Sequence, residues 1–592
     1  MQGLRNLFTK TEAVITNNWY PVTLGLFSFP FWCLLVAVFG FIVFIPVSKY
    51  HAIVAFLLAL GTIAWACEWN VKRSVILSAV FCGLLFLALL PTAFVFENDC
   101  DTWWVNHLAA IPIAQGWNPL YQFQSPTGTW ATHYPKGDRI INAVLYSFTG
   151  NLQSGNLSQI LFPLLVFPFC CCALPKIFSL AKWKNLLLSL YLAFNPVLLS
   201  QFFIGKEDGI FTACLTILFF GLIAYLKSKD NRFFPFIIGS IIVATNVKFT
   251  GVVYVAVFLI TVLLPLLITG IWNKNPLNKK LTGVLVLATA LSLTVGFNPY
   301  LYNVYHHISP FHPVITVKEE EKRDFPRDQH WYEQPDFIKA NKFERFAFYH
   351  LNPFKRGGSN SRKEPFTAYP IFNLYAMPLL FSFFMFPFIR NKYVWLLFIG
   401  SCLSIASQPH SWIFRYVPQL WFIPVIVIAS LWETTEALSL WKKRYNVIAT
   451  LIILFCISQG NTSFLDAARY HYVYTIKSYA SILQYKDDML SISPCKPYLH
   501  YNGDYSMKHS LIPDCFPNIK INCLEYKEHI ENISIRYAGY IPVYLSPDVQ
   551  PLPKMTRRDL PQMVKLILQL RLRQFKRVWG LEQPPIPVQT PK

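Results

Sequence analysis

Three acidic residues stand close together in the stretch ENDCD, namely Glu97, Asp99 and Asp101. They follow directly on an apolar run from Ser74 to Phe96, which is long enough to cross a bilayer. Carboxylates at the exit of a span are costly to desolvate, which makes them candidates for a functional site. One could accept the proton of an attacking hydroxyl, and the others could bind a divalent cation. The alternative is a solvated loop whose acids only face water.

A second acidic pair, Glu207 and Asp208, follows Lys206 in the short turn KED between two apolar runs. Glu207 and Asp208 could pair with the lysine or supply oxygen ligands to a divalent cation such as Mg²⁺ or Mn²⁺. The alternative is helix capping, because an acid at the start of a span interacts favourably with the helix dipole.

Two cations occupy span boundaries: Lys248 in TNVKFTG, and Arg415 beside Tyr416 in SWIFRYVP. A cation at such a boundary either meets an anion or extends its charged end to the interface. Arginine suits a phosphate because its planar fork makes two contacts, whereas lysine acts as a point charge. We therefore expect Lys248, Arg415 and Tyr416, together with Lys206, to bind the substrate; anchoring at the interface is the alternative.

Two histidines, His107 and His133, lie in the polar stretch that runs from Glu97 to Arg139. They are further candidates for substrate binding. The alternative for both is packing at the membrane interface.

Composition identifies the kind of protein that must position these residues. Of 592 residues, 54% are hydrophobic and only 14% are charged, and the mean hydropathy is +0.36. Soluble domains carry about a quarter charged residues, so the chain is predicted to be an all-α polytopic membrane protein. The net charge of +21 then reports topology and contact with membrane lipids, and it does not point to nucleic acid.

With about 20 apolar residues per span, the sequence predicts about thirteen transmembrane helices. Their ranges are 22–48, 51–68, 74–96, 158–179, 185–204, 208–227, 233–249, 251–272, 281–299, 371–389, 393–409, 416–432 and 445–459.

Short basic connections alternate along this region, and the positive-inside rule assigns them to the cytoplasmic face. They contain Lys72 and Arg73, Lys182 and Lys184, Lys227 to Arg232, Lys274 to Lys280, Arg390 and Lys392, and Lys442 to Arg444. The outer face then carries the loops 97–157 and 300–370, the KED turn and the Arg415 turn. We therefore expect a functional surface on the non-cytoplasmic side.

Two segments outside the spans have structure of their own. Trp103–Gln115 is apolar enough to form an interfacial helix in the first outer loop, and it ends at GWNP. Residues 1–460 are predicted to form the membrane domain and residues 461–592 a small α/β extramembrane domain. The basic segment Lys554–Trp579 is typical of a surface-lying helix and would suit the cytoplasmic side better than the outer one.

The arrangement resembles the membrane-embedded C-type glycosyltransferases (GT-C fold) that use polyprenyl-phosphate sugars, among them the protein O-mannosyltransferases and the aminoarabinose transferases of lipid A. The resemblance spans about residues 74–430. It is carried by ENDCD after a span, by NHLAAIPIAQGWNP, HYPKG and KED, and by KFTG, FNPYLYN and RY. Two spans precede the one that leads into the acidic loop, whereas many members have one.

The resemblance implies transfer of a sugar, with inversion, from a polyprenyl-phosphate donor to a glycan, lipid or protein acceptor. Asp99 or Asp101 would be the base and Glu97 a further acid of the site. A bacterial inner membrane with the site facing the periplasm is the expected location. The alternatives are a lipid-linked glycan flippase, which would need polar residues in mid-span, and a polymerase or ligase of the O-antigen kind.

Overall fold

The computed structural model describes most of the membrane region and parts of the C-terminal region. The described residues are 2–95, 102, 106–268, 276–314, 341–351, 376–411, 413–435, 444–458, 461, 464–465, 468–469, 491–492, 534–538, 541–545 and 560–581, with the backbone alone for residues 2–19. The three acids of ENDCD, Trp103 and most of the loop 300–370 therefore lie outside the described residues.

The first half of the chain folds into helices joined by short turns. They are α1 (Gln2–Ile42), α2 (Lys49–Ala66), α3 (Val71–Phe94), α4 (His107–Ala114), α5 (Thr129–His133), α6 (Gly137–Thr149), η2 (Leu152–Asn156), α7 (Leu157–Ile177), α8 (Lys182–Ala193), α9 (Pro196–Ser200), α10 (Asp208–Ser228), η3 (Asn231–Phe233), α11 (Phe234–Val247) and α12 (Phe249–Ile268).

The second half continues the bundle and adds a small sheet. Its elements are α14 (Pro276–Val295), η4 (Phe297–Leu301), α15 (Tyr302–Tyr305), α16 (Lys342–Phe346), η8 (Ala347–Leu351), α17 (Ala376–Met385), η10 (Phe386–Phe388), α18 (Lys392–Ala406), η11 (Phe414–Tyr416), η12 (Pro418–Trp421), α19 (Phe422–Thr435), a helix at Arg444–Ser458, strands β1 (Ser491–Ile492), β2 (Ser534–Ala538) and β3 (Ile541–Leu545), and α23 (Leu560–Val578).

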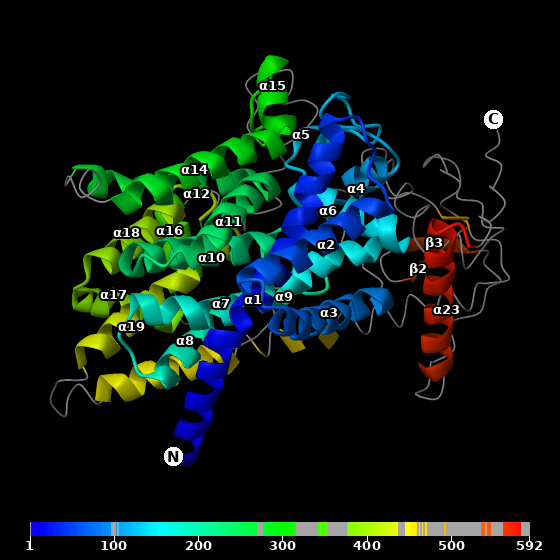
Figure 1. Ribbon diagram of the computed structural model, residues 1–592. Coiled ribbons are helices and arrows are strands. Elements are labelled where there is room, and N and C mark those ends of the chain that lie inside the picture. The colour runs from blue at the N-terminus through cyan, green and yellow to red at the C-terminus, as the bar shows by residue number, and fades with distance from the viewer. Residues whose placement is uncertain are drawn as a thin grey trace.

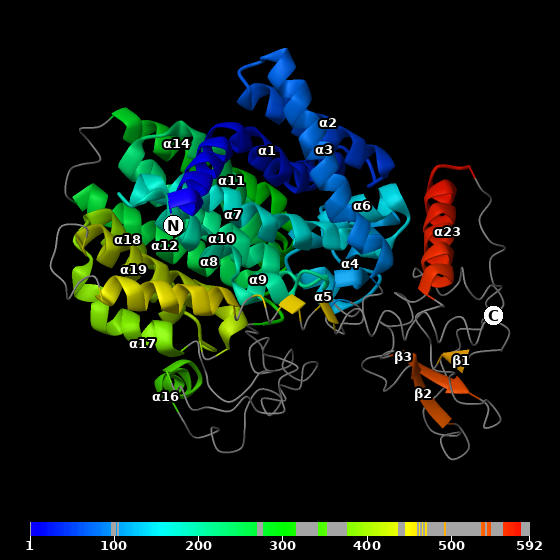
Figure 2. The same cartoon turned by 90° about the horizontal axis from the view of Figure 1, so that it is seen from below.

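Helix α10 occupies the centre of the bundle, between α7 and α11 (Figures 1 and 2). Its entire apolar window is buried, whereas only 22% of the corresponding window of α3 is buried. The side chains that α3 leaves exposed are large and apolar, such as Val75, Phe86 and Leu87. Such a surface is stable against lipid and unfavourable in water, so α3 and its neighbour α2 form the membrane-facing perimeter.

Among the described residues, five helices are long and apolar enough to cross a membrane, and a sixth results if the bent α14–α15 pair counts as one span. The chain is therefore a multi-pass membrane protein. Shorter apolar helices occupy most of the other predicted spans, for instance Asn231–Val247 and Lys392–Ala406. The number of thirteen spans stays a prediction.

The described part of the loop 97–157 folds into α4, α5 and α6 at one end of the bundle (Figure 1). Helix α4 ends at Ala114, one residue before the predicted end at Gln115, and its residues His107–Ile113 are all buried. It is covered by α5 and α6 rather than lying on the surface, which differs from the expected interfacial helix. Helix α6 is buried on all sides from Gly137 to Leu145, and its C-cap is Gly150, whose φ of +71° is the left-handed conformation that glycine adopts without strain.

The C-terminal region contributes a sheet and one long helix to the described residues. The strands are antiparallel in the order β1-β3-β2. Helix α23 packs against α3 and α6, so it lies at the end of the bundle that carries the loop 97–157. The basic segment therefore does not sit at the opposite face. The extent of a separate C-terminal domain stays a prediction.

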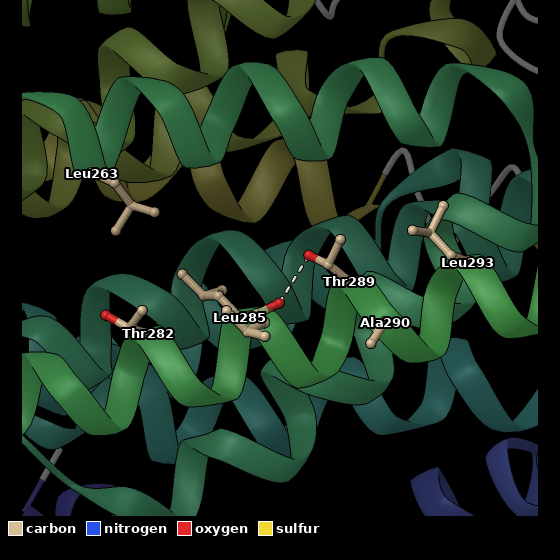
Figure 3. A pocket seen from close by; sticks show the side chains of 7 residues that line it. Leu263, Thr282, Leu285, Thr289, Ala290 and Leu293 are labelled. Carbon is tan, nitrogen blue, oxygen red and sulfur yellow. Dashed lines mark hydrogen bonds between the residues drawn. The ribbon is translucent and has the colours of Figure 1, made fainter.

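An apolar groove of about 490 Å³ lies between α12 and α14 (Figure 3). It is lined by Leu263, Thr282, Leu285, Val286, Thr289, Ala290 and Leu293. The Thr289 hydroxyl donates a hydrogen bond to the carbonyl oxygen of Leu285, so its polarity is satisfied within its own helix. Val286 and Leu293 are exposed, which makes the groove part of the lipid-facing surface.

Gly251 sets how closely α12 approaches α11. A Cβ at this position would overlap the carbonyl oxygen of Ala244, whereas one at Gly83, inside α3, would meet nothing within 4 Å. We expect Gly251→Ala to lower the free energy of unfolding by about 1–3 kcal/mol, because backbone atoms must move apart. Gly83→Ala should be neutral or stabilising. Thermal unfolding of the detergent-purified variants would contradict this account if both glycines tolerated alanine equally.

Candidate functional site

A buried ion-pair cluster forms around Asp208, the first residue of α10. The Lys248 ammonium pairs with Asp208 Oδ1, and Arg415 Nη1 lies 3.9 Å from Asp208 Oδ2. The three side chains are only 4–11% exposed. Because two cations share one carboxylate, this trio carries a net positive charge in a place that excludes most water. Such a cluster can bind an anion.

Gln201 fixes the position of Asp208. Its Nε2 donates to Asp208 Oδ2 at 2.9 Å, and its Oε1 accepts from the backbone N–H of Gly209 at 3.1 Å. Gln201 follows the short helix α9, which starts where Asn195 caps Val197 and Pro196 takes the first helical position. The break between α8 and α10 therefore places the Gln201 amide beside the start of α10. There it donates a hydrogen bond to the Asp208 carboxylate and accepts one from a backbone N–H group of the first helical turn.

Lys248 is the one extended residue between α11 and α12, with φ −146° and ψ 140°. This break turns its side chain toward Asp208 and places its Nζ 4.7 Å from the ring centre of Tyr416. Tyr254 donates a hydrogen bond to the Tyr416 carbonyl oxygen at 2.5 Å and so links α12 to the Arg415 turn. The cation therefore has both a carboxylate and an aromatic face as partners.

Glu207 connects the cluster to the loop 97–157. The Tyr134 hydroxyl donates to Glu207 Oε1 at 3.1 Å, and the Arg139 guanidinium lies 4.6 Å from the ring centre of Tyr134. Arg139 is fully buried and donates from Nε to Asn106 Oδ1 at 3.2 Å. Asn106 in turn donates to the carbonyl oxygen of Gly205. Gly205 and Glu207, which flank Lys206, are thus both tied to the loop 97–157.

Lys136 joins the same loop to the segment FNPYLYN. Its buried ammonium donates to the carbonyl oxygens of Thr132 and Tyr134 at 2.6 and 3.0 Å and to Asn298 Oδ1 at 2.7 Å. Asn298 also donates to the carbonyl oxygen of Pro119 at 2.7 Å. Burial lowers the pKa of Lys136 well below its usual range, and the nearby positive charge of Arg139 lowers it further. All three donors of the ammonium have an acceptor.

His133 makes a second set of contacts between the loop 97–157 and the segment that contains Asn303 and His312. Its Nδ1 lies 2.8 Å from Asn303 Oδ1, and its ring contacts those of His312 and Phe123 edge-on, at centre distances of 4.6 and 5.3 Å. Burial lowers the pKa of His133 to about 4, so the ring is neutral at neutral pH. Burial also lowers the pKa of His107, to about 3. Both histidines are therefore uncharged components of the loop.

The structure brings five of the predicted site residues together: Glu207, Asp208, Lys248, Arg415 and Tyr416. Lys206 precedes them in the KED turn. His133 belongs to the second set of contacts, and His107 is buried in α4. Glu97, Asp99 and Asp101 lie outside the described residues, so their place relative to the cluster stays a prediction.

The oxygens of Asp208 are occupied by Lys248 and Gln201, so they are poorly suited to binding a cation as well. Across the described part of the chain, no three His, Cys, Asp or Glu side chains are grouped so that they could hold a metal ion. The divalent cation remains a prediction, because the acids of ENDCD are not among these residues.

Several residues of the network were not predicted as site residues, among them Tyr134, Lys136, Arg139 and Gln201. The first three belong to HYPKGDR, where two cations close together in one short stretch were a usable signal. The sequence carried no comparable signal for Gln201, because a single glutamine at the end of an apolar run is equally typical of a solvent-exposed position. Its role depends on the contact with Asp208, which only the folded chain provides.

The fold and the cluster define a class: a multi-pass membrane protein with a buried, net positive ion-pair cluster where its helices meet the first large loop. No protein-family model matches the sequence. No curated protein matches it either. Among solved structures, the chain is similar to the crystal structure of ArnT from Cupriavidus metallidurans bound to undecaprenyl phosphate, with 10% identity, a TM-score of 0.40, and coverage of 73% of this chain and 84% of that one. A TM-score of 0.40 is too low to bear on function or on residue roles.

Removing the central carboxylate should destabilise the protein strongly. We expect Asp208→Asn to lower the free energy of unfolding by about 3–5 kcal/mol, because it leaves Lys248 and Arg415 buried without their anion. Asp230→Asn is the matched control, since Asp230 pairs at 2.6 Å with Arg232, whose side chain is 55% exposed, and should cost less than about 1 kcal/mol. Thermal unfolding in detergent measures both, and equal losses would contradict the buried pair.

Asp138 should make stability depend on pH. Burial raises its pKa to about 7, although the adjacent Arg139 guanidinium acts in the opposite direction. A folded-state pKa above the ordinary value of 3.8 contributes stability that is complete below about pH 4 and is lost as the pH rises through about 7. Between about pH 5 and pH 8, the apparent melting temperature should therefore fall more steeply for the wild type than for Asp138→Asn. Parallel curves would show that Asp138 does not titrate in this range.

Proposed function

We propose that the protein is an integral membrane glycosyltransferase that transfers a sugar from a polyprenyl-phosphate donor to an acceptor glycan, lipid or protein. The observation that carries the proposal is the meeting of Lys248 and Arg415 on Asp208, with two cations around one carboxylate. The cluster lies at the start of α10 and at the break between α11 and α12, and we propose that this end of the helices reaches the lipid headgroups. A phosphate ester anchored in the bilayer is the anion whose chemistry fits that place.

Arg415 and Lys248 would stabilise the charge that develops on the departing phosphate. Tyr416 contacts both cations: its ring centre is 5.1 Å from the Arg415 guanidinium, and its hydroxyl oxygen is 3.2 Å from Arg415 Nη2. Asp208 would hold the cations in place before the substrate arrives, so little reorganisation is needed during the reaction. Lys206 and His133 would contribute to donor binding from the sides of the cluster.

In the proposed reaction, an acceptor hydroxyl oxygen attacks the anomeric carbon from the face opposite the phosphate. The new carbon–oxygen bond forms as the carbon–oxygen bond to the phosphate breaks, and the polyprenyl phosphate leaves with the electron pair. Asp99 or Asp101 takes the hydroxyl proton. The configuration at the anomeric carbon is inverted. A divalent cation, if one takes part, would be held by Glu207 together with acids of ENDCD.

The distribution of charge favours transfer over transport. After Asp208, helix α10 continues to Tyr225 without a charged residue, although its apolar window is completely buried. A flippase needs polar groups along the path of its substrate through the membrane. In the proposed location the transferase lies in a bacterial inner membrane, with the site facing the periplasm.

Arg415 should be needed to retain the donor lipid. Arg415→Gln leaves the Asp208–Lys248 pair intact but removes the excess positive charge, so the affinity for a phosphate should fall about tenfold or more. We expect mass spectrometry of wild-type protein purified in mild detergent to detect a co-purified polyprenyl phosphate, and Arg415→Gln to have lost it. Arg232→Gln, which changes an exposed arginine at the other end of α11, is the control.

The acids of ENDCD provide a second arm of this test. A variant with both Asp99→Asn and Asp101→Asn should still co-purify with the lipid but should transfer no sugar from a polyprenyl-phosphate donor. Wild-type protein that carries only ordinary phospholipids, or a double variant that transfers sugar at the native rate, would refute the proposed reaction.

A further inference from the structure

Helix α23 is attached to the ends of helices far from it in sequence. Arg571 donates from Nε to the Ala93 carbonyl oxygen at 3.0 Å, at the last turn of α3, and from Nη2 to Gln153 at 3.3 Å. Trp579 donates from its indole to the Phe148 carbonyl oxygen at 3.3 Å. The guanidinium thus satisfies a carbonyl group that the end of α3 leaves without an intrahelical partner.

The N-terminal end of α2 makes a further contact with this helix. Lys49 donates to the Val578 carbonyl oxygen at 3.1 Å, and its ammonium lies 4.5 Å from the ring of Trp579. A Cβ at Gly150 would lie 2.8 Å from the Gln574 carbonyl oxygen, so the glycine permits the close approach of α23 to α6. These contacts make α23 an integral part of this end of the bundle.

The neighbours of α23 fix its depth relative to the bilayer. It joins the start of α2 and the end of α3, two helices whose apolar windows are only 28% and 22% buried. Helices with such exposed apolar sides face lipid, so their ends reach the headgroup layer. In Figure 1, α23 stands upright beside the end of the bundle that carries α4 and α6, while α7 and α10 run across the picture. This crosswise orientation is the one expected of a helix that lies along the surface of a bilayer.

The face that α23 turns away from the protein is basic and apolar at once. Its exposed stripe recurs at helical spacing and consists of Lys565, Leu568, Gln569, Leu572, Arg573 and Lys576. Leu568 and Leu572 are 46% and 54% exposed, although the opposite face buries Ile567 and Leu570. From Leu560 to Leu581 the sequence has five cations and no acid. Two exposed leucines flanked by lysine and arginine are the pattern of a helix lying in a membrane interface.

We propose that α23 docks on anionic phospholipid through this stripe, at the same face of the membrane as the first large loop. The leucines enter the boundary between headgroups and acyl chains, while the cations extend to the lipid phosphates. Each cation near an anionic surface contributes about 1 kcal/mol. Since Arg571 contacts the end of α3, docking would also hold the exit of that span, which leads into ENDCD. The inference does not depend on the proposed reaction.

A fluorescent noncanonical residue at position 572 of the full-length protein tests the proposal. The protein is reconstituted in nanodiscs that contain brominated lipid, which quenches fluorophores at acyl depth. With phosphatidylglycerol present, we expect quenching at 572 to approach that at 87, a lipid-facing position of α3. In phosphatidylcholine alone, or with Lys565→Gln, Arg573→Gln and Lys576→Gln combined, quenching at 572 should fall several-fold.

Two exposed lysines at the start of α14, Lys279 and Lys280, provide the matched control. Changing both to Gln should leave quenching at 572 unaltered. A reporter at 572 that is unquenched in phosphatidylglycerol bilayers would show that the stripe faces water and would overturn the proposal. Quenching that persists in the triple variant would equally overturn the role of the anionic lipid.

Discussion

The buried carboxylate of Asp208 is the constraint on which the site depends. Lys248 and Arg415 come from breaks in the bundle that are far apart in sequence, and neither could remain buried without a shared anion. Asp208 is itself held by Gln201 and by its place at the start of α10. The result is a preorganised trio, Asp208 with Lys248 and Arg415, in which two cations share one carboxylate; on the proposed function, this trio binds a phosphate.

The helices and loops around Asp208 are arranged so that its partners can reach it. Helix α11 stops before Lys248 so that the lysine can turn inward, and Gly251 allows α12 to pack closely against α11 beyond the break. Tyr134 and Arg139 extend the network from Glu207 into the first loop, and Lys136 fastens that loop to Asn298. Three loops are thus fixed around one end of α10, each by a polar group that has a partner in another loop.

The sequence predicts the membrane character and most helix positions well, because long apolar runs and basic connections are local signals. It also indicates Asp208, Lys248 and Arg415, since charges at span boundaries need partners. It does not predict which cation meets which acid, because that depends on how α10, α11 and α19 pack. Helix α4 illustrates the same limit: its apolar composition suggested an interfacial helix, whereas tertiary contacts bury it. The positions of Glu97, Asp99 and Asp101 lie outside the described residues and stay a prediction.

We propose that the Asp208 cluster binds the phosphate of a polyprenyl lipid. Photoaffinity labelling with a polyprenyl phosphate that carries a photoreactive group next to the phosphate tests it most directly. Cross-linked peptides should map to the KED turn, to residues 246–251 and to the Arg415 turn, and an excess of unlabelled polyprenyl phosphate should suppress them. Labelling confined to the lipid-facing sides of α2 and α3, or labelling that excess lipid does not suppress, would contradict the account.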